Sequence, residues 1–200
     1  MRVTLADLEI VCFDPATHNV AGFDCGDSDL NDFLKSDAAK YQADHLSHTR
    51  LAFLRGDLVG YITLLADCII LQTSEKKKTL KEARTHHQSI YTFPAIKIGR
   101  IGVDKNSQQT GVGTQLLIYT IGLVFRMNRE LNIGCRFITL DAYPKSVSWY
   151  EKKHFMFNKH YSRPPKTLAA VMAFGRTLLG REKKTHPSMR YDILKSSKIT

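Results

Sequence analysis

Residues 98–117 read IGRIGVDKNSQQTGVGTQLL, and this stretch decides the fold. The apolar alternation before Asp104 predicts a strand, and the apolar residues after Gly113 predict a helix. The loop between them carries glycines that let the backbone approach a ligand closely, and a helix N-terminus adds about half a positive charge. The stretch therefore predicts a strand, an anion-binding loop suited to phosphate and a helix in succession.

The spacing Gln108-x-x-Gly111-x-Gly113 differs from two familiar phosphate motifs. The dinucleotide-binding fingerprint is G-x-G-x-x-G and the P-loop ends in Gly-Lys-Ser/Thr, and the stretch matches neither. A Gly-x-Gly at a helix start also occurs in ordinary tight turns, so the assignment depends on the segments around it.

Hydrophobic periodicity and turn residues place further elements on both sides of this stretch. Their order is typical of an α/β chain with a mixed sheet. The expected strands are 2–5 with 9–13, 49–54, 58–65, 95–103, 136–140, 155–161 and 189–194, and the expected helices are 27–42, 113–131, 146–153 and 167–179.

Length and composition indicate one ordinary globular domain. The 200 residues are 43% hydrophobic and 24% charged, which is enough for a core without disulfides or metal. Acidic residues near the N-terminus argue against a signal peptide, and the uncharged stretch Asn106 to Phe125 is too polar to span a membrane. The four cysteines are scattered, which argues against zinc and disulfides and indicates a cytoplasmic protein.

The formal net charge of +10 is unevenly distributed. Residues 1–73 carry a net −6, whereas residues 74–100 carry +5 and residues 145–200 carry +10. Such asymmetry suits an acidic face and a phosphate-binding face, but a solvated surface rich in lysine explains it equally well. The charged segment 73–92 interrupts the pattern of strands and is predicted to be a surface insertion.

A second motif follows in the segment Trp149-Tyr150-Glu151-Lys152-Lys153-His154-Phe155. Together with Gln108, Gly111 and Gly113, it resembles the GNAT family of N-acetyltransferases, which use acetyl-CoA. His154 stands where the family usually has glycine, and Gln109 where many members carry an additional glycine. The resemblance covers most of residues 9–160. It implies a single GNAT domain over 1–200, with a mostly antiparallel sheet that is splayed at its central strands and flanked by helices.

The resemblance also implies how acetyl-CoA binds. Backbone N–H groups of the loop would hold the pyrophosphate, and the strand segment 101–103 would pair with the pantetheine arm as an added strand. Gly102 suits a bulge in that strand, although a glycine that lets a helix pack closely is the alternative. The implied cofactor-binding residues are Ile101, Gly102, Val103, Gln108, Gln109, Thr110, Gly111, Val112, Gly113 and Thr114, with no metal.

Tyr150 matches the family tyrosine that protonates the departing CoA thiolate, and Tyr143 is a second candidate. A core tyrosine beside Trp149 is the structural alternative for Tyr150. The sequence offers no clear general base, because Asp141 and Glu151 fit structural or solvated positions better. Cys135 is expected to be a buried strand residue rather than an acyl carrier.

The segment Phe23-Asp24-Cys25-Gly26, followed by Leu30 and Phe33-Leu34, resembles a GNAT subgroup that includes toxins of toxin–antitoxin modules. Those enzymes acetylate the amino group of aminoacyl-tRNA. The resemblance implies direct acetyl transfer to that amine, with tRNA bound through basic segments 76–84 and 145–200, and a small ribbon-helix-helix antitoxin as partner.

Two other functions stay open at this stage. The first is an acetyltransferase for a small amine or a protein amine without RNA, whose cationic acceptor the acids near Asp24 would attract. The second is a non-catalytic module that binds CoA or a partner. The apolar stripe of 167–179 is expected to serve as core or as a homodimer contact rather than as a membrane helix.

Overall fold

The computed structural model describes residues 2–71, 79, 92–158 and 186–194. Contacts divide the chain into two compact units, Met1–Ala66 with Ile96–Gly134 and Asp67–Ala95 with Cys135–Thr200. Seven strands form one sheet in the order β1-β2-β3-β4-β5-β7-β6. The predicted α/β class with a mostly antiparallel sheet is thereby confirmed, whereas the splay and the single domain stay predictions. The predicted insertion at 73–92 lies outside the described residues apart from Thr79 and Thr92, and the helix at 167–179 lies outside them altogether.

The first unit contains strands β1 (Glu9–Cys12), β2 (His48–Leu54), most of β3 (Asp57–Ile69) and most of β4 (Phe93–Val103). β1 pairs antiparallel with β2, and β2 pairs antiparallel with β3, with a register shift between Ala52 and Phe53. The turn Arg55-Gly56 joins β2 to β3, and both residues have positive φ, as tight hairpin turns require. The strands predicted for 49–54 and 58–65 are confirmed, and they pair as a hairpin.

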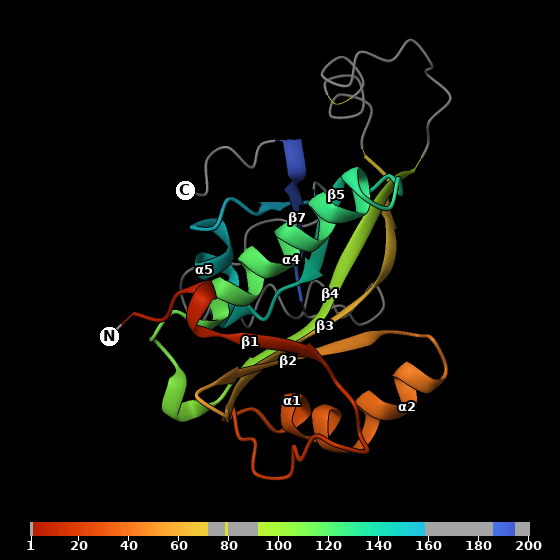
Figure 1. The fold of residues 1–200 in the computed structure, drawn as a ribbon. Helices are drawn as coiled ribbons and strands as arrows, with labels where there is room; N and C mark the ends of the chain where they lie inside the picture. Colours follow the sequence, from red (N-terminus) through yellow and green to blue (C-terminus); the bar gives the residue numbers. More distant parts are fainter. Residues whose placement is uncertain (1, 72–78, 80–91, 159–185, 195–200) are drawn as a thin grey trace, which may run out of the picture. The chain divides into compact units, whose positions relative to one another are not determined.

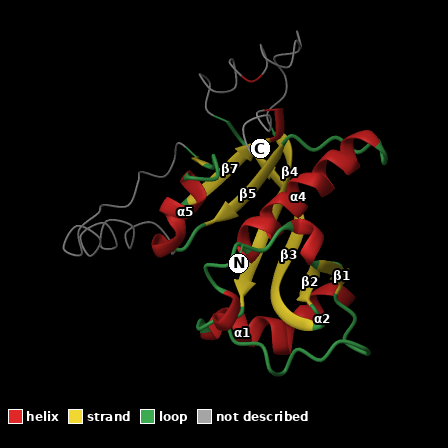
Figure 2. Ribbon diagram, turned by 60° about the vertical axis from the view of Figure 1, so that its left-hand side comes forward, coloured by secondary structure: helices red, strands yellow, loops and turns green. Residues whose placement is uncertain are grey.

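Helical segments lie on both faces of these strands (Figures 1 and 2). One face carries α1 (Ser28–Asp32), the π-helical turn η2 (Phe33–Asp37) and α2 (Ala38–Ala43), in place of the uninterrupted helix predicted for 27–42. The opposite face carries α4 (Val112–Arg129). Adjacent strand residues point to opposite faces. Accordingly Tyr61 lies in the core cluster with Phe33, while a Cβ at Gly60 would meet Val112 of α4 at 3.1 Å.

The second unit contains β5 (Phe137–Asp141), the 3-10 turn η4 (Pro144–Ser146), α5 (Val147–Glu151), β6 (Met156–Phe157) and β7 (Ser188–Asp192). β7 pairs antiparallel with both β5 and β6. Phe93 and Phe137 meet edge to face at 6.0 Å in a core cluster of this unit. A bidentate ion pair at 2.8 and 3.0 Å joins Arg136 to Asp192, and both side chains are largely buried.

The strand predicted for residues 2–5 is wrong, because the 3-10 turn η1 (Leu5–Asp7) begins there. The Asp7 carboxylate accepts hydrogen bonds from the backbone N–H and the hydroxyl of Thr4 at 2.8 and 2.7 Å. Such local side-chain bonds compete with strand pairing, which the apolar alternation alone does not register. The strand predicted for 155–161 is present only as Met156–Phe157, and residues 159–161 lie outside the described chain.

Candidate functional site

We call residues 104–111 the phosphate loop. It contains the 3-10 turn η3 (Lys105–Ser107) and leads directly into α4. Gln109 has a φ of 65° and Gly111 a φ of 110°, so the backbone turns left-handed twice within three residues. Turns of this kind direct successive backbone N–H groups toward one side, and such concavities bind anions.

The helix that follows adds donors to this concavity. The first N–H groups of an α-helix have no carbonyl four residues earlier to bond to. In α4, the N–H groups of Thr114 and Gln115 donate to the carbonyl of Gly111 at 2.9 and 3.1 Å. Val112 and Gly113 come before these two residues, so their N–H groups lie at the very start of the helix. The phosphate loop and the start of α4 therefore present backbone donors and the positive end of a helix dipole, as a phosphate site needs.

Gln108 holds the phosphate loop in place. Its side-chain amide donates to the carbonyl of Cys25 at 2.9 Å and to the carbonyl of Val103 at 3.1 Å. The amide nitrogen thus ties the loop to the Phe23–Gly26 turn and to the end of β4. In this structure the Gln108 side chain therefore supports the loop, and its assignment to acetyl-CoA binding stays a prediction.

Asp24 is a second residue that holds the phosphate loop, through Lys105. Its carboxylate accepts from the ammonium of Lys105 at 2.8 Å, from the backbone N–H of Gly26 at 2.9 Å and from the amide of Asn31 at 2.9 Å. The Lys105 ammonium and the two neutral donors hold the pKa of the Asp24 carboxyl far below its usual range. The sequence suggested Asp24 as an attractor for a cationic acceptor, whereas in the structure its carboxylate is bonded to Lys105, Gly26 and Asn31.

Residues 2–4, which we call the N-terminal arm, pack against the phosphate loop beside Gly111. The N–H of Val3 donates to the carbonyl of Thr110 at 2.8 Å, and the carbonyl of Val3 accepts from the Gln115 side chain at 3.1 Å. A Cβ at Gly111 would lie 3.2 Å from that Val3 carbonyl oxygen. Both the positive φ and this contact require glycine at the position. The Thr110 hydroxyl donates to the carbonyl of Ser107 at 2.6 Å, which braces the loop internally.

Gly102 owes its identity to aromatic neighbours. A Cβ there would lie 2.6 Å from Cε1 of Tyr61 and 3.4 Å from Cζ of Phe23. The helix contact considered from the sequence is wrong, because the atoms nearest to such a Cβ belong to these two rings. Ile101 and Val103 flank Gly102 on β4 and are half-buried, so the predicted pantetheine segment lies on a strand with partly open side chains.

A cavity of about 580 Å³ adjoins the phosphate loop in the first unit. Its walls come from the N-terminal arm, the β2–β3 hairpin and the loop itself. The lining includes Arg2, Val3, Asp7, Arg55, Asp57, Asn106, Ser107 and Thr110.

Tyr150 lies in the second unit, on α5, and is 6% exposed. Its ring meets Trp149 at 4.8 Å and Phe155 at 5.5 Å between centroids, both near edge-to-face. Burial raises the pKa of the Tyr150 phenol well above its ordinary value, because the phenolate would lose its hydration. The phenol carries its proton at neutral pH, as an ordinary tyrosine also does.

We call residues 150–155 the tyrosine turn. The N–H groups of Lys153 and Phe155 donate to the carbonyl of Tyr150 at 2.9 and 3.1 Å and close the turn. His154 within it has a φ of 64°. The left-handed conformation explains physically why glycine suits this position in the motif, and the same holds for Gln109 in the phosphate loop.

The remaining candidates of the second unit lie as follows. The ring of Tyr143 meets His186 edge to face at 4.4 Å, and the ammonium of Lys145 lies 5.5 Å from the Tyr143 centroid. Cys135 is buried, and its thiol lies 3.5 Å from the carbonyl oxygen of Phe137, which fits the expected structural role.

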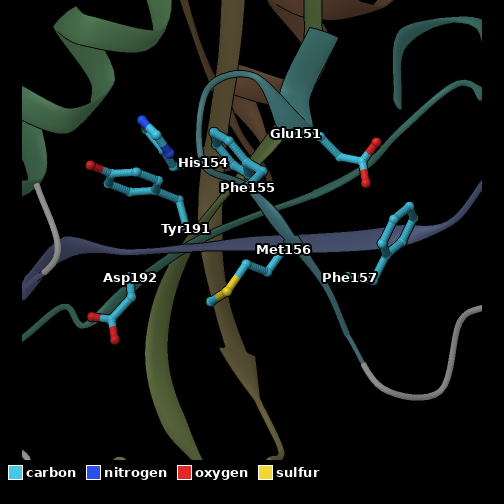
Figure 3. A pocket seen from close by; sticks show the side chains of 7 residues that line it. All are labelled: Glu151, His154, Phe155, Met156, Phe157, Tyr191 and Asp192. Atoms are coloured by element: carbon cyan, nitrogen blue, oxygen red, sulfur yellow. The ribbon is translucent and has the colours of Figure 1, made fainter. Parts of the chain in front are cut away.

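A cavity of about 570 Å³ lies beside the tyrosine turn (Figure 3). It is lined by Glu151, His154, Phe155, Met156, Phe157, Tyr191 and Asp192. Tyr150 is not among the lining residues, although its ring packs against Phe155. The cavity therefore does not include the Tyr150 side chain.

No cluster of three or more His, Cys, Asp or Glu side chains within the described ranges has the geometry to hold a metal ion. No helix within those ranges has both the length and the hydropathy needed to cross a bilayer.

Solved structures share this fold over nearly the whole chain. AtaT complexed with acetyl-methionyl-tRNAfMet has a TM-score of 0.68 at 18% identity, over 96% of this chain and 98% of that one. A tyrosine-to-phenylalanine mutant of the toxin AtaT, bound to the C-terminus of the antitoxin AtaR and acetyl-CoA, has a TM-score of 0.63 at 17% identity, over 94% of each chain. A tyrosine-to-phenylalanine mutant of KacT has a TM-score of 0.63 at 20% identity, over 97% and 99%.

No family model matches the sequence. The likeness nevertheless extends over nearly the whole chain, and AtaT is a toxin that has been solved with the antitoxin AtaR and acetyl-CoA. The chain therefore has the GNAT fold, as the sequence predicted.

Proposed function

We propose that this chain is an acetyl-CoA-dependent N-acetyltransferase that transfers acetyl directly to the amino group of aminoacyl-tRNA. The observation that carries the proposal is the phosphate loop, where two left-handed residues and the start of α4 gather backbone donors. The match in fold to AtaT, solved with acetyl-CoA and with acetyl-methionyl-tRNAfMet, supports the cosubstrate and the acceptor.

The proposed chemistry assigns each group one task. Acetyl-CoA supplies a thioester, whose carbon–sulfur bond breaks as the acceptor nitrogen bonds to the carbonyl carbon. Backbone N–H groups of residues 109–114 hold the pyrophosphate, and the segment 101–103 pairs with the pantetheine arm. A free N–H of that strand polarises the thioester carbonyl.

Two protons must move in this reaction. Tyr150 donates its phenolic proton to the departing thiolate and regains one from solvent. The amine proton leaves to water, and an aminoacyl ester lowers the pKa of its amine enough to need little further help. The tyrosine-to-phenylalanine variants among the similar structures support a special role for a tyrosine in this fold.

The proposed partners follow from charge and from the similar structures. The basic segments 76–84 and 145–200 would contact tRNA phosphates, so binding must weaken steeply with salt. AtaT has been solved with the C-terminus of its antitoxin AtaR, which supports a small antitoxin as partner here. Binding of tRNA that does not change with salt would contradict the electrostatic part of this proposal.

The decisive experiment is labelled acetyl transfer from acetyl-CoA to bulk aminoacylated tRNA. Deacylated tRNA is the matched control, because it keeps the phosphates and lacks the amine. A panel of free polyamines, peptides and protein lysines runs in parallel. Label only on charged tRNA supports the proposal. Label on the free amines and not on charged tRNA supports the alternative acetyltransferase, and no label on any acceptor supports a binding module.

A further inference from the structure

Arg100 is a cation on β4, and no ion pair with a carboxylate is found for it among the described residues. Its guanidinium carbon lies 4.0 Å from the centroid of the Phe33 ring. Its Nε atom is buried and has no hydrogen-bond partner within the described part of the chain. By contrast, the ammonium of Lys105 lies 2.8 Å from Asp24, and the guanidinium of Arg126 lies 3.0 Å from Glu130.

A buried N–H donor without an acceptor is costly, and more so on a charged group. Unsatisfied buried polar groups are rare in folded proteins, and a catalytic or binding role is one of the reasons for which they are retained. The position supports this reading, because Arg100 directly precedes the segment 101–103 to which the proposed function assigns the pantetheine arm. Residues two apart on a strand share a face, so Arg100 lies on the same face of β4 as Gly102, whose neighbours are Tyr61 and Phe23.

The surroundings of Arg100 indicate what it would bind. A guanidinium that stacks on an aromatic face keeps its N–H groups directed outward at its edge, where they match two oxygens of a phosphate or carboxylate. Phe33 also begins the π-helical turn η2, and π-helical turns occur frequently at functional sites. The pairing of Arg100 with Phe33 therefore suits an anionic oxygen brought by the acceptor.

We propose that Arg100 selects the acceptor by binding a phosphate oxygen next to the reacting amine. This inference rests on the proposed function, in which the acceptor is charged tRNA. The anion nearest to the amine of charged tRNA is the phosphodiester on the 5′ side of the terminal adenosine. The chain has 29 basic against 19 acidic residues, which favours phosphate over the carboxylate of an acidic peptide.

Binding of the phosphate by Arg100 also affects the protonation of the acceptor amine. A phosphate close to an amine favours the protonated ammonium, which is not a nucleophile. A guanidinium that neutralises that phosphate removes this effect, so the amine loses its proton more readily. The same fixed positive charge disfavours polycationic acceptors, because like charges repel at short range.

The test uses the full chain and two minimal acceptors, 3′-aminoacylamino-3′-deoxyadenosine with and without a 5′-phosphate. Both carry the same amine, and they differ only in the phosphate. We expect the wild-type protein to favour the phosphorylated acceptor by about tenfold or more in kcat/KM, as charge-assisted hydrogen bonds allow. Arg100→Gln should bring this ratio close to one. Arg100→Lys should keep part of it, because lysine keeps the charge and loses the planar fork.

Arg126→Gln is the matched control, since it removes one positive charge from an exposed pair on α4 and should leave the ratio unchanged. Acetyl-CoA affinity and thermal unfolding are measured for every variant. If Arg100→Gln does not fold, Arg100→Lys decides the question. An unchanged phosphate preference in a folded Arg100 variant, or an equal loss on both acceptors, overturns the inference. A wild-type protein that acetylates neither these acceptors nor charged tRNA contradicts the proposed function instead.

Discussion

The phosphate loop and the tyrosine turn are held by different kinds of contact. Polar bonds from residues far away in the sequence fix the phosphate loop, through Gln108 and Asp24. Contacts between aromatic rings fix the tyrosine turn: Tyr150 packs against Trp149 and Phe155, and Phe155 packs against Tyr191. A loop that presents backbone donors must keep them in contact with water and ligand, whereas the aromatic contacts of the tyrosine turn keep the Tyr150 ring buried. The two scaffolds therefore differ in what they expose and what they bury.

The largest effect is expected where the tyrosine turn loses its proton donor. Tyr150→Phe keeps the ring and its contacts and removes the hydroxyl. We expect kcat to fall by about 10²- to 10⁴-fold, as is typical for loss of a general acid. Steady-state kinetics with charged tRNA measures it, and thermal unfolding should change little. Tyr143→Phe is the control, and a larger loss there than at Tyr150 would show that Tyr143 is the donor.

The next effect concerns the backbone of the phosphate loop. Gly111→Ala forces a side chain into a φ of 110° and against the Val3 carbonyl. We expect a loss of about 1–3 kcal/mol in stability and weaker acetyl-CoA binding. Gly122→Ala is the matched control, because a Cβ at this α4 position meets nothing within 4 Å. It should stabilise the protein by about 0.5–1 kcal/mol. Denaturant unfolding and calorimetric titration with acetyl-CoA test both variants.

A smaller effect is expected from the side chain that ties the loop to the Phe23–Gly26 turn. Gln108→Ala removes hydrogen bonds to the carbonyls of Cys25 and Val103. Each is expected to contribute about 0.5–1.5 kcal/mol net. Acetyl-CoA affinity should fall while kcat at saturation is kept, because the loop is displaced and Tyr150 is not. Unchanged affinity would mean that the loop holds its shape without Gln108.

Glycine at the left-handed position of the tyrosine turn should raise stability slightly. His154→Gly relieves a φ of 64°, and the gain should be about 0.5–1 kcal/mol, because the relief exceeds the added freedom of the unfolded chain. Lys152→Gly is the control two residues earlier, where φ is −63°, and glycine should destabilise there. Urea unfolding of the two variants distinguishes relief of strain from a general response to glycine.

The smallest effect is expected from the exposed ion pair of the phosphate loop. The pKa of the Asp24 carboxyl is lowered in the folded protein, so the folded state binds fewer protons than the unfolded one. Its contribution to stability is present above the unfolded pKa near 3.8 and is lost as the pH falls below it. Asp24→Asn should therefore show a shallower loss of Tm between pH 5 and pH 3 than the wild-type protein, and parallel curves would contradict this.

The local elements of both regions were predictable from the sequence. Apolar periodicity placed β4, α4 and the β2–β3 hairpin within a few residues of their observed bounds. The glycine pattern placed the phosphate loop, because only a few residue types suit left-handed turns. The roles of Gln108 and Asp24 were not predictable, since their partners lie 83 and 81 residues away in the sequence.

The aromatic contact of Arg100 was also not predictable from the sequence. In the sequence Arg100 is one basic residue within a strand, with nothing to distinguish it from Lys97. Its contact with Phe33 exists only because the helical segment 28–43 lies over β4 in the folded unit. Hydrophobic periodicity could not predict the π-helical turn that begins at Phe33, because a helix with one wider turn keeps nearly the same apolar pattern.

The sequence by itself determined the order of strands and helices, the turn residues and the two motifs, because each of these depends on neighbours within a few residues. The tertiary structure decided which side chains hold the phosphate loop, why Gly102 must be glycine and which aromatic ring Arg100 stacks on. These depend on distances between segments far apart in the chain, and such distances are set by packing of the whole unit rather than by local preference.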